Sequence, residues 1–101
     1  MINLCLGSAQ FGMDYGVTNS SGKVPENEVK KIIKLASQNN INFFDTAQSY
    51  GNSEKILGKY LYMFDNPIII TKLSRDKKAF YTEKDVSLWE SSFIKSLKNL
   101  N

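Results

Sequence analysis

The sequence has 101 residues, and its 42% hydrophobic and 12% aromatic content is enough for the core of one small globular domain. Thirteen Lys and Arg against ten Asp and Glu give a net charge of +3, spread along the chain rather than gathered into a basic stripe for nucleic acid. No apolar run approaches the ~20 residues of a membrane span, and the N-terminus has no signal-peptide pattern. The single cysteine, Cys5, cannot form a disulfide within the chain, which suits a reducing compartment. We therefore expect a cytoplasmic protein with no nucleic-acid and no membrane partner.

Three short apolar runs predict the strands of a sheet. They extend from Ile2 to Gly7, from Ile41 to Asp45 and from Ile68 to Thr71. The third is a continuous β-branched run, which is typical of a parallel strand covered on both faces. By the period of two, Lys72 lies on the same face as the first residue of that strand.

Two helical patterns follow the first and second strands. The first helix is expected to begin at Pro25 and to end at Asn39 and Asn40, because Asn tolerates the left-handed conformation at a helix end. The second is expected to be capped by Ser53. Its apolar face is predicted to bury four residues: Ile56, Leu57, Tyr60 and Leu61.

A third helix is predicted from Thr82, where Thr82 and Asp85 form a capping box. Its apolar stripe is interpreted as core and consists of Val86, Trp89, Phe93, Leu97 and Leu100. Two segments are expected to be loops. The first, from Ser8 to Val24, is rich in Gly, Ser, Asn and Asp, and the second, from Ser74 to Lys78, is charged and solvated.

Strands that alternate with helices through mostly short connections favour a right-handed parallel βα series. In such a series the loops that follow the strands meet at the carboxyl edge of the sheet, where barrel enzymes place their chemistry. Asp45 and Tyr50 follow the second strand and Lys72 follows the third. We therefore expect these three side chains to lie together.

The segment around the second strand resembles the signature of the aldo-keto reductase family. The matching residues are Phe44-Asp45-Thr46-Ala47 and Tyr50-Gly51-Asn52-Ser53-Glu54, supported upstream by Leu6-Gly7-Ser8-Ala9-Gln10-Phe11-Gly12 and downstream by Ile69-Ile70-Thr71-Lys72. The whole chain resembles only about the N-terminal third of a family member. The resemblance therefore implies an α/β fold comprising the N-terminal three βα units of a TIM (β/α)8 barrel, incomplete over residues 1–101, because a full barrel needs about 250 residues.

The resemblance also implies chemistry for the three residues. Reduction of a carbonyl by a hydride needs a proton for the developing alkoxide. A free tyrosine, with a pKa near ~10, is too weak an acid, but a neighbouring lysine ammonium favours the phenolate. We thus expect Tyr50 to be the proton donor, Lys72 to assist it and Asp45 to keep Lys72 charged. Taken singly, each has an ordinary structural explanation, as a turn, packing or solvent-facing residue, but the matched motif favours catalysis.

By the same resemblance, the cofactor is NADP(H) and the substrate is a small-molecule carbonyl compound. Ser8, Ala9 and Asp45 are implied to contact the nicotinamide end of the cofactor. The family's catalytic histidine has no counterpart, since the sequence contains no histidine. The isolated chain is therefore expected to be inactive, as the N-terminal fragment of an NADP-dependent oxidoreductase.

Two other functions stay open. One is a non-catalytic, truncated or regulatory relative that acts through a protein partner. The other, less compatible with the motif, is an unrelated barrel lyase or isomerase that uses Lys72 as a Schiff-base amine. In either case the outer strands would be unpaired, so self-association of the chain is also expected.

Overall fold

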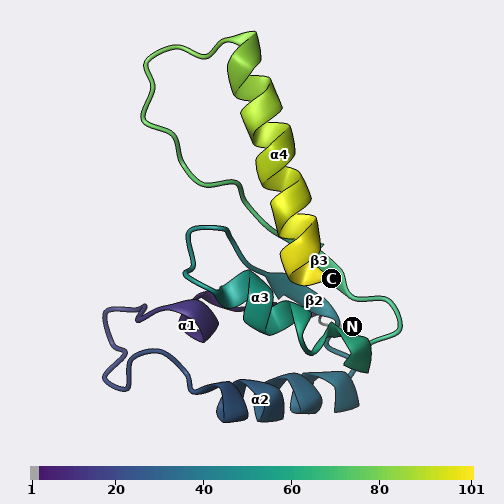
Figure 1. Ribbon diagram of the computed structural model, residues 1–101. Coiled ribbons are helices and arrows are strands. Elements are labelled where there is room, and N and C mark those ends of the chain that lie inside the picture. Colours follow the sequence, from purple (N-terminus) through teal and green to yellow (C-terminus); the bar gives the residue numbers. More distant parts are fainter. Residues whose placement is uncertain (1–2) are drawn as a thin grey trace.

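The computed structural model describes residues 3–101, which contain a three-stranded parallel sheet (Figure 1). Its strands are β1 (Cys5–Gly7), β2 (Phe43–Asp45) and β3 (Ile68–Ile70), in the order β1-β2-β3. The register pairs Gly7 with Asp45 and Asp45 with Ile70, so the carboxyl ends of all three strands are level. The three predicted strands are confirmed but shorter, and Ile2, the predicted first residue of the first strand, lies outside the described residues.

The three predicted helices are α2 (Glu26–Gln38), α3 (Ser53–Gly58) and α4 (Glu83–Leu100). Pro25 occupies the N-cap position of α2, and Asn40 after its end has a φ of 56°, as expected for an Asn in the left-handed region. The 3-10 helix η1 (Leu61–Met63) follows α3, so the second helix is shorter than predicted. None of the helices within residues 3–101 is long and apolar enough to cross a membrane.

The segment from Ser8 to Val24 is not only a loop, which corrects the sequence prediction. It opens with a short helix, α1 (Ala9–Gly12), which the sequence concealed because four residues are too few to show a periodic pattern. The rest of the segment forms hydrogen bonds within itself and with α1. Val24 N–H donates to Gln10 O at 2.8 Å, and the side chain of Asn19 donates to Tyr15 O at 2.8 Å.

The core lies between one face of the sheet and the helices that cover it. Phe44 of β2 is completely buried and packs with buried residues of α1, α2 and α3, namely Phe11, Val29, Ile33, Ile56 and Leu57. In each strand only the middle residue points into this core, while its two neighbours are more exposed. Ile56 and Leu57 are therefore core residues, as predicted, whereas Tyr60 and Leu61 are only partly buried.

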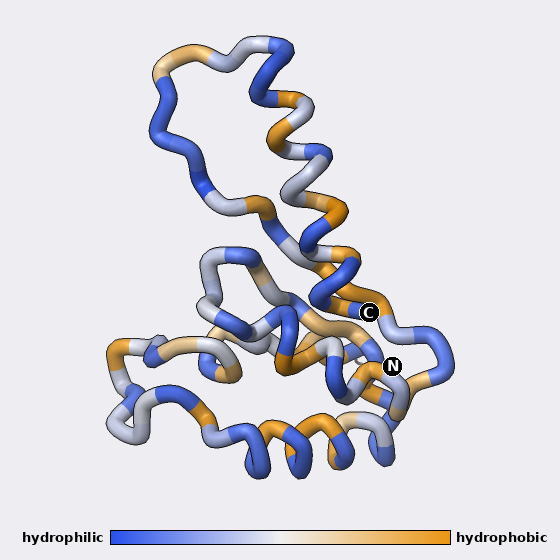
Figure 2. Tube along the Cα trace, viewed as in Figure 1, coloured by the Kyte–Doolittle hydropathy of each residue, from blue (hydrophilic) through white to orange (hydrophobic). Residues whose placement is uncertain are grey.

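Helix α4 projects away from the sheet, and its apolar stripe is not core (Figure 1). It packs against α3 near its C-terminus, and Leu100 alone among the stripe residues reaches the core. Trp89 and Phe93 are 38% and 53% exposed, and Figure 2 shows hydrophobic positions recurring along α4 as it extends away from the rest of the chain. The prediction was wrong because periodicity shows that a helix has an apolar face but not what covers it. The radius of gyration, 15.0 Å, exceeds the about 13 Å of a compact 100-residue domain for the same reason.

Two local predictions about α3 and α4 had different outcomes. Thr82 is the N-cap of α4, and its N–H donates to Asp85 Oδ2 at 2.7 Å, so the capping box is confirmed. Ser53 does not cap α3, because Asn52 occupies the cap position and Ser53 is the first helical residue. The charged segment before α4 was predicted to be a solvated loop, but its Lys78 forms ion pairs with Asp76 and Asp85.

Candidate active site

Asp45 and Lys72 form an ion pair at the carboxyl edge of the sheet. Asp45 is the last residue of β2, and Lys72 lies two residues beyond β3. Lys72 Nζ is 2.5 Å from Asp45 Oδ1 and also donates to Thr46 O at 3.2 Å. The hydrogen bond with Asp45 is the main cause that raises the pKa of Lys72 above its ordinary value, with a further contribution from Tyr50. Lys72 is therefore a cation at neutral pH.

Tyr50 lies beside this ion pair in the loop between β2 and α3. Lys72 Nζ is 5.4 Å from the centroid of the Tyr50 ring, within the range of a cation–π contact. A turn closed by the hydrogen bond from Tyr50 N–H to Ala47 O, 3.1 Å long, sets the course of the backbone here. The structure thus brings Asp45, Tyr50 and Lys72 together, as the sequence predicted.

A cavity of about 390 Å³ adjoins this group and is lined in part by Ser8, Ala9, Tyr15, Asp45 and Tyr50. This volume is within the range of small-molecule sites. The rings of Tyr15 and Tyr50 are 6.1 Å apart at an angle of 46°, so the first loop supplies one wall. The three residues expected to contact the cofactor, Ser8, Ala9 and Asp45, all line this cavity.

Buried hydroxyl groups fasten the first loop beneath Asp45. Ser8, Thr46 and Ser53 are fully buried. Ser8 donates to Asp45 O from both its N–H and its Oγ, each at 2.9 Å, and Ser53 Oγ donates to Ser8 O at 2.7 Å. The hydroxyl groups of Ser8 and Ser53 are thus already engaged inside the protein, which explains why Ser53 does not cap α3.

Two glycines allow the backbone of α1 to lie in close contact with the loop that carries Tyr50. A Cβ atom on Gly12 would lie 1.8 Å from Tyr50 O, and one on Gly51 would lie 2.2 Å from Gly12 O. Gly51 also has a φ of 58°, which L side chains rarely adopt. The backbone of α1 therefore supports the backbone of Tyr50 directly.

Comparison with known proteins now bears on this geometry. A sequence model described as the Aldo/keto reductase family matches residues 3–101. The chain belongs to the aldo-keto reductase family. Its structure is similar to the crystal structure of PA4992, a "putative aldo-keto reductase" of Pseudomonas aeruginosa, with 30% identity and a TM-score of 0.71. A second "putative aldo-keto reductase" from the same organism has 25% identity and a TM-score of 0.68.

These comparisons match nearly all of this chain but only part of each relative. The match covers 95% of this aldo-keto reductase chain and 37% and 36% of the two relatives. The predicted fold is therefore confirmed: the three parallel βα units form part of a TIM barrel.

Sequence reasoning missed several residues that shape the site. Gly12 belonged to the matched upstream motif but was assigned no role, and Tyr15 and Gln48 gave no signal, because the roles of all three depend on partners far away in the sequence. Gln48 contacts α4, more than forty residues later, and Gly12 contacts the Tyr50 backbone. Glu54 belonged to the motif, but nothing in the motif indicated that its carboxylate would be buried.

Proposed function

We propose that this chain is the N-terminal part of an NADP(H)-dependent aldo-keto reductase that reduces aldehyde or ketone carbonyls, with Tyr50 as the proton donor. The observation that carries the proposal is the geometry of Lys72, whose ammonium is paired with Asp45 at 2.5 Å and lies over the Tyr50 ring. The proposal includes a cytoplasmic location, which suits the free, exposed Cys5.

Each residue would have a distinct part in the reaction. Tyr50 would donate its phenolic proton to the carbonyl oxygen as negative charge develops there. The Lys72 ammonium would stabilise the phenolate that remains. Asp45 would keep Lys72 charged and oriented, consistent with the raised pKa of Lys72. The same raised pKa disfavours Lys72 as a Schiff-base amine, which must be neutral to attack a carbonyl.

The site fits the nicotinamide end of the cofactor. Lys72 donates to Asp45 Oδ1. The other carboxylate oxygen of Asp45 has no hydrogen-bond partner among residues 3–101 and could accept a hydrogen bond from a ribose hydroxyl. Ser8 and Ala9 line the same cavity, but Ser8 is fully buried and its hydroxyl donates to Asp45 O. The cofactor, when bound, supplies the hydride.

A chimera tests the proposal. Residues 3–101 would replace the matching segment of the PA4992 protein, and reduction of a generic aldehyde with NADPH would be measured. Tyr50→Phe should lower kcat by about 10²- to 10⁴-fold, because it removes one general acid, with little effect on NADPH binding. Tyr62→Phe is the matched control, since Tyr62 is 74% exposed on η1. Equal rates for Tyr50→Phe and the unmodified chimera would refute the role of Tyr50. The chain alone should show no reductase activity and only weak NADPH binding.

We also propose that the isolated chain self-associates. Both outer strands have an unpaired edge within residues 3–101, and Ile68 and Ile70 of β3 are 46% and 48% exposed. The exposed stripe of α4 adds apolar surface. Such edges and patches recruit partners. Light scattering at tens of micromolar should give a mass above 11.5 kDa, and a stable monomer would contradict this proposal.

A non-catalytic relative that acts through a protein partner is the second candidate function. The exposed α4 stripe favours it, since it offers an apolar surface to a partner. An inactive chimera that is folded and still binds NADPH would support this candidate over the first.

A further inference from the structure

Lys72 is held by few contacts of the sheet itself. It lies beyond the end of β3, which is an outer strand, and the chain from there to Thr82 is exposed. The paired residues of β2 and β3 end at Asp45 and Ile70, but backbone bonding continues beyond them, since Thr46 N–H donates to Ile70 O at 2.8 Å. The Lys72 ammonium bonds to Asp45 Oδ1 and Thr46 O, so the question is which contacts hold the backbone of Lys72 and of the exposed residues after it.

Gln48 provides contacts to the segment that carries Lys72. Its backbone N–H donates to Lys72 O at 3.0 Å, and its Oε1 accepts from Ser74 N–H at 3.0 Å. Gln48 also belongs to the turn that ends at Tyr50. One residue therefore joins the loop of the proposed proton donor to Lys72 itself and to Ser74, two residues after it.

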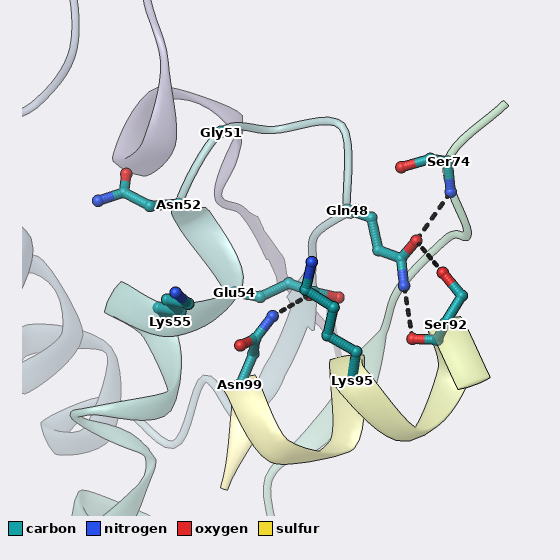
Figure 3. Close-up of a pocket in the computed structure, with 9 residues that line it drawn as sticks. All are labelled: Gln48, Gly51, Asn52, Glu54, Lys55, Ser74, Ser92, Lys95 and Asn99. Carbon is teal, nitrogen blue, oxygen red and sulfur yellow. Dashed lines mark hydrogen bonds between the residues drawn. The ribbon is translucent and has the colours of Figure 1, made fainter.

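The Gln48 side chain is itself fixed by α4, as Figure 3 shows in part. Its Nε2 donates to Ser92 O and Ser96 Oγ, each at 2.8 Å, and its Oε1 accepts from Ser92 Oγ at 2.9 Å. With the bond from Ser74, all four hydrogen-bonding positions of the amide are used. A rotated or displaced amide would leave several polar groups without partners, so the side chain has a single favoured position.

Glu54 of α3 forms a second connection of this kind, between the residue before Lys72 and α4. It is only 4% exposed, and its Oε1 accepts from Thr71 Oγ1 at 2.7 Å while its Oε2 accepts from Asn99 of α4 at 3.1 Å. Thr71 directly precedes Lys72. Thr71 before Lys72 and Ser74 after it are therefore both connected to the C-terminal half of α4, through Glu54 and Gln48 respectively.

From these contacts we propose that Gln48 is a positioning residue that holds Lys72 beside Tyr50, with α4 as its anchor. The inference rests on the proposed function only for the importance of Lys72, because the hydrogen bonds themselves can be measured without activity. It gives α4 a role in the site although only Leu100 of its apolar stripe reaches the core.

The test uses the 101-residue chain and compares Gln48→Met with Gln38→Ala. Methionine keeps most of the side-chain volume but removes every amide hydrogen bond, whereas Gln38 is an exposed glutamine of α2 and serves as the control. NMR would follow hydrogen exchange of the Ser74 amide and the titration of the Lys72 side chain. In folded Gln48→Met, we expect Ser74 exchange to be about tenfold faster and the pKa of Lys72 to fall toward its ordinary value.

Unchanged Ser74 exchange and an unchanged Lys72 titration in folded Gln48→Met would overturn the proposal. If Gln48→Met does not fold, Ser92→Ala removes only the hydroxyl bond to Gln48 Oε1 and should give changes in the same direction, about two- to threefold for exchange. No change in Ser92→Ala would then refute α4 as the anchor. Neither readout depends on reductase activity, so an inactive chimera and a failed positioning test are separate results.

Discussion

The contact between Gly12 and the Tyr50 loop allows a sharp test by Gly12→Ala. The added Cβ would lie 1.8 Å from Tyr50 O, 2.5 Å from Ser53 N and 2.8 Å from Ser53 Cβ, where ordinary contacts begin at 3.4 Å. All but one of these are backbone atoms, so no flexible side chain can move aside. The variant must separate α1 from the loop by more than an ångström and strain the 3.0 Å hydrogen bond from Ser53 N–H to Tyr50 O.

The expected cost follows from these distances. Overpacking costs about 1–3 kcal/mol, and the better helix propensity of Ala returns at most about 1 kcal/mol. Since the clash is with backbone, we expect a net loss of about 2 kcal/mol. With an m-value of about 2 kcal/mol/M, the urea midpoint followed by circular dichroism should fall by about 1 M.

Gly7→Ala is the matched control, because a Cβ on Gly7 would meet nothing within 4 Å. Its urea midpoint should change little, since surface substitutions usually stay within about 0.5 kcal/mol. If the two variants had equal midpoints, the close approach of α1 to Tyr50 would not exist in solution. In the chimera, Gly12→Ala should also lower kcat by displacing Tyr50.

Two further predictions concern α4 and the ion pair. Gly58→Ala should destabilise the chain by about 1–3 kcal/mol, because its Cβ would lie 2.1 Å from Asn99 O and force α3 from α4; an unchanged urea midpoint would contradict this. The Lys72–Asp45 pair should stabilise the fold fully below pH 10.5 and lose that effect as the pH rises through the raised pKa of Lys72. The difference in urea midpoint between the unmodified chain and Asp45→Asn should therefore be constant from pH 7 to 9 and begin to shrink only above pH 10.5; equal midpoints of the two proteins at pH 7 to 9 would count against the pair.

The sequence was sufficient to predict the fold and the grouping of the main site residues. Strand and helix patterns around Phe44 implied a parallel βα series, and such a series places Asp45, Tyr50 and Lys72 at one edge by topology alone. No distance between them was needed. The prediction succeeded because it depended on chain order and periodicity, which the sequence contains.

What the sequence could not supply were contacts between particular atoms of distant segments. The hydroxyl of Ser53 looked like a helix cap because caps are recognised locally, yet its partner is Ser8, forty-five residues away. The stripe around Trp89 looked like core because its period is helical, yet its exposure depends on which elements lie opposite. The local sequence pattern was least informative about burial in α4, the helix that projects away from the sheet.

Each of the three site residues is held by a contact from a different residue. Ser8 fixes the backbone of Asp45 by hydrogen bonds, Gly12 supports the backbone of Tyr50 by direct packing, and Gln48 ties down the segment of Lys72.

Ser8 and Gly12 belong to the segment that follows β1 and includes α1, whereas Gln48 is held in place by α4. Because the contacts of Gly12 and of the Gln48 side chain involve different atoms, weakening one should disturb mainly the residue that it holds. Gly12→Ala should therefore leave Ser74 exchange unchanged, and Gln48→Met should leave the Tyr15–Tyr50 ring contact intact. If each variant instead loosened both features, the loops would form one cooperative unit, and the separate role inferred for Gln48 would have to be abandoned.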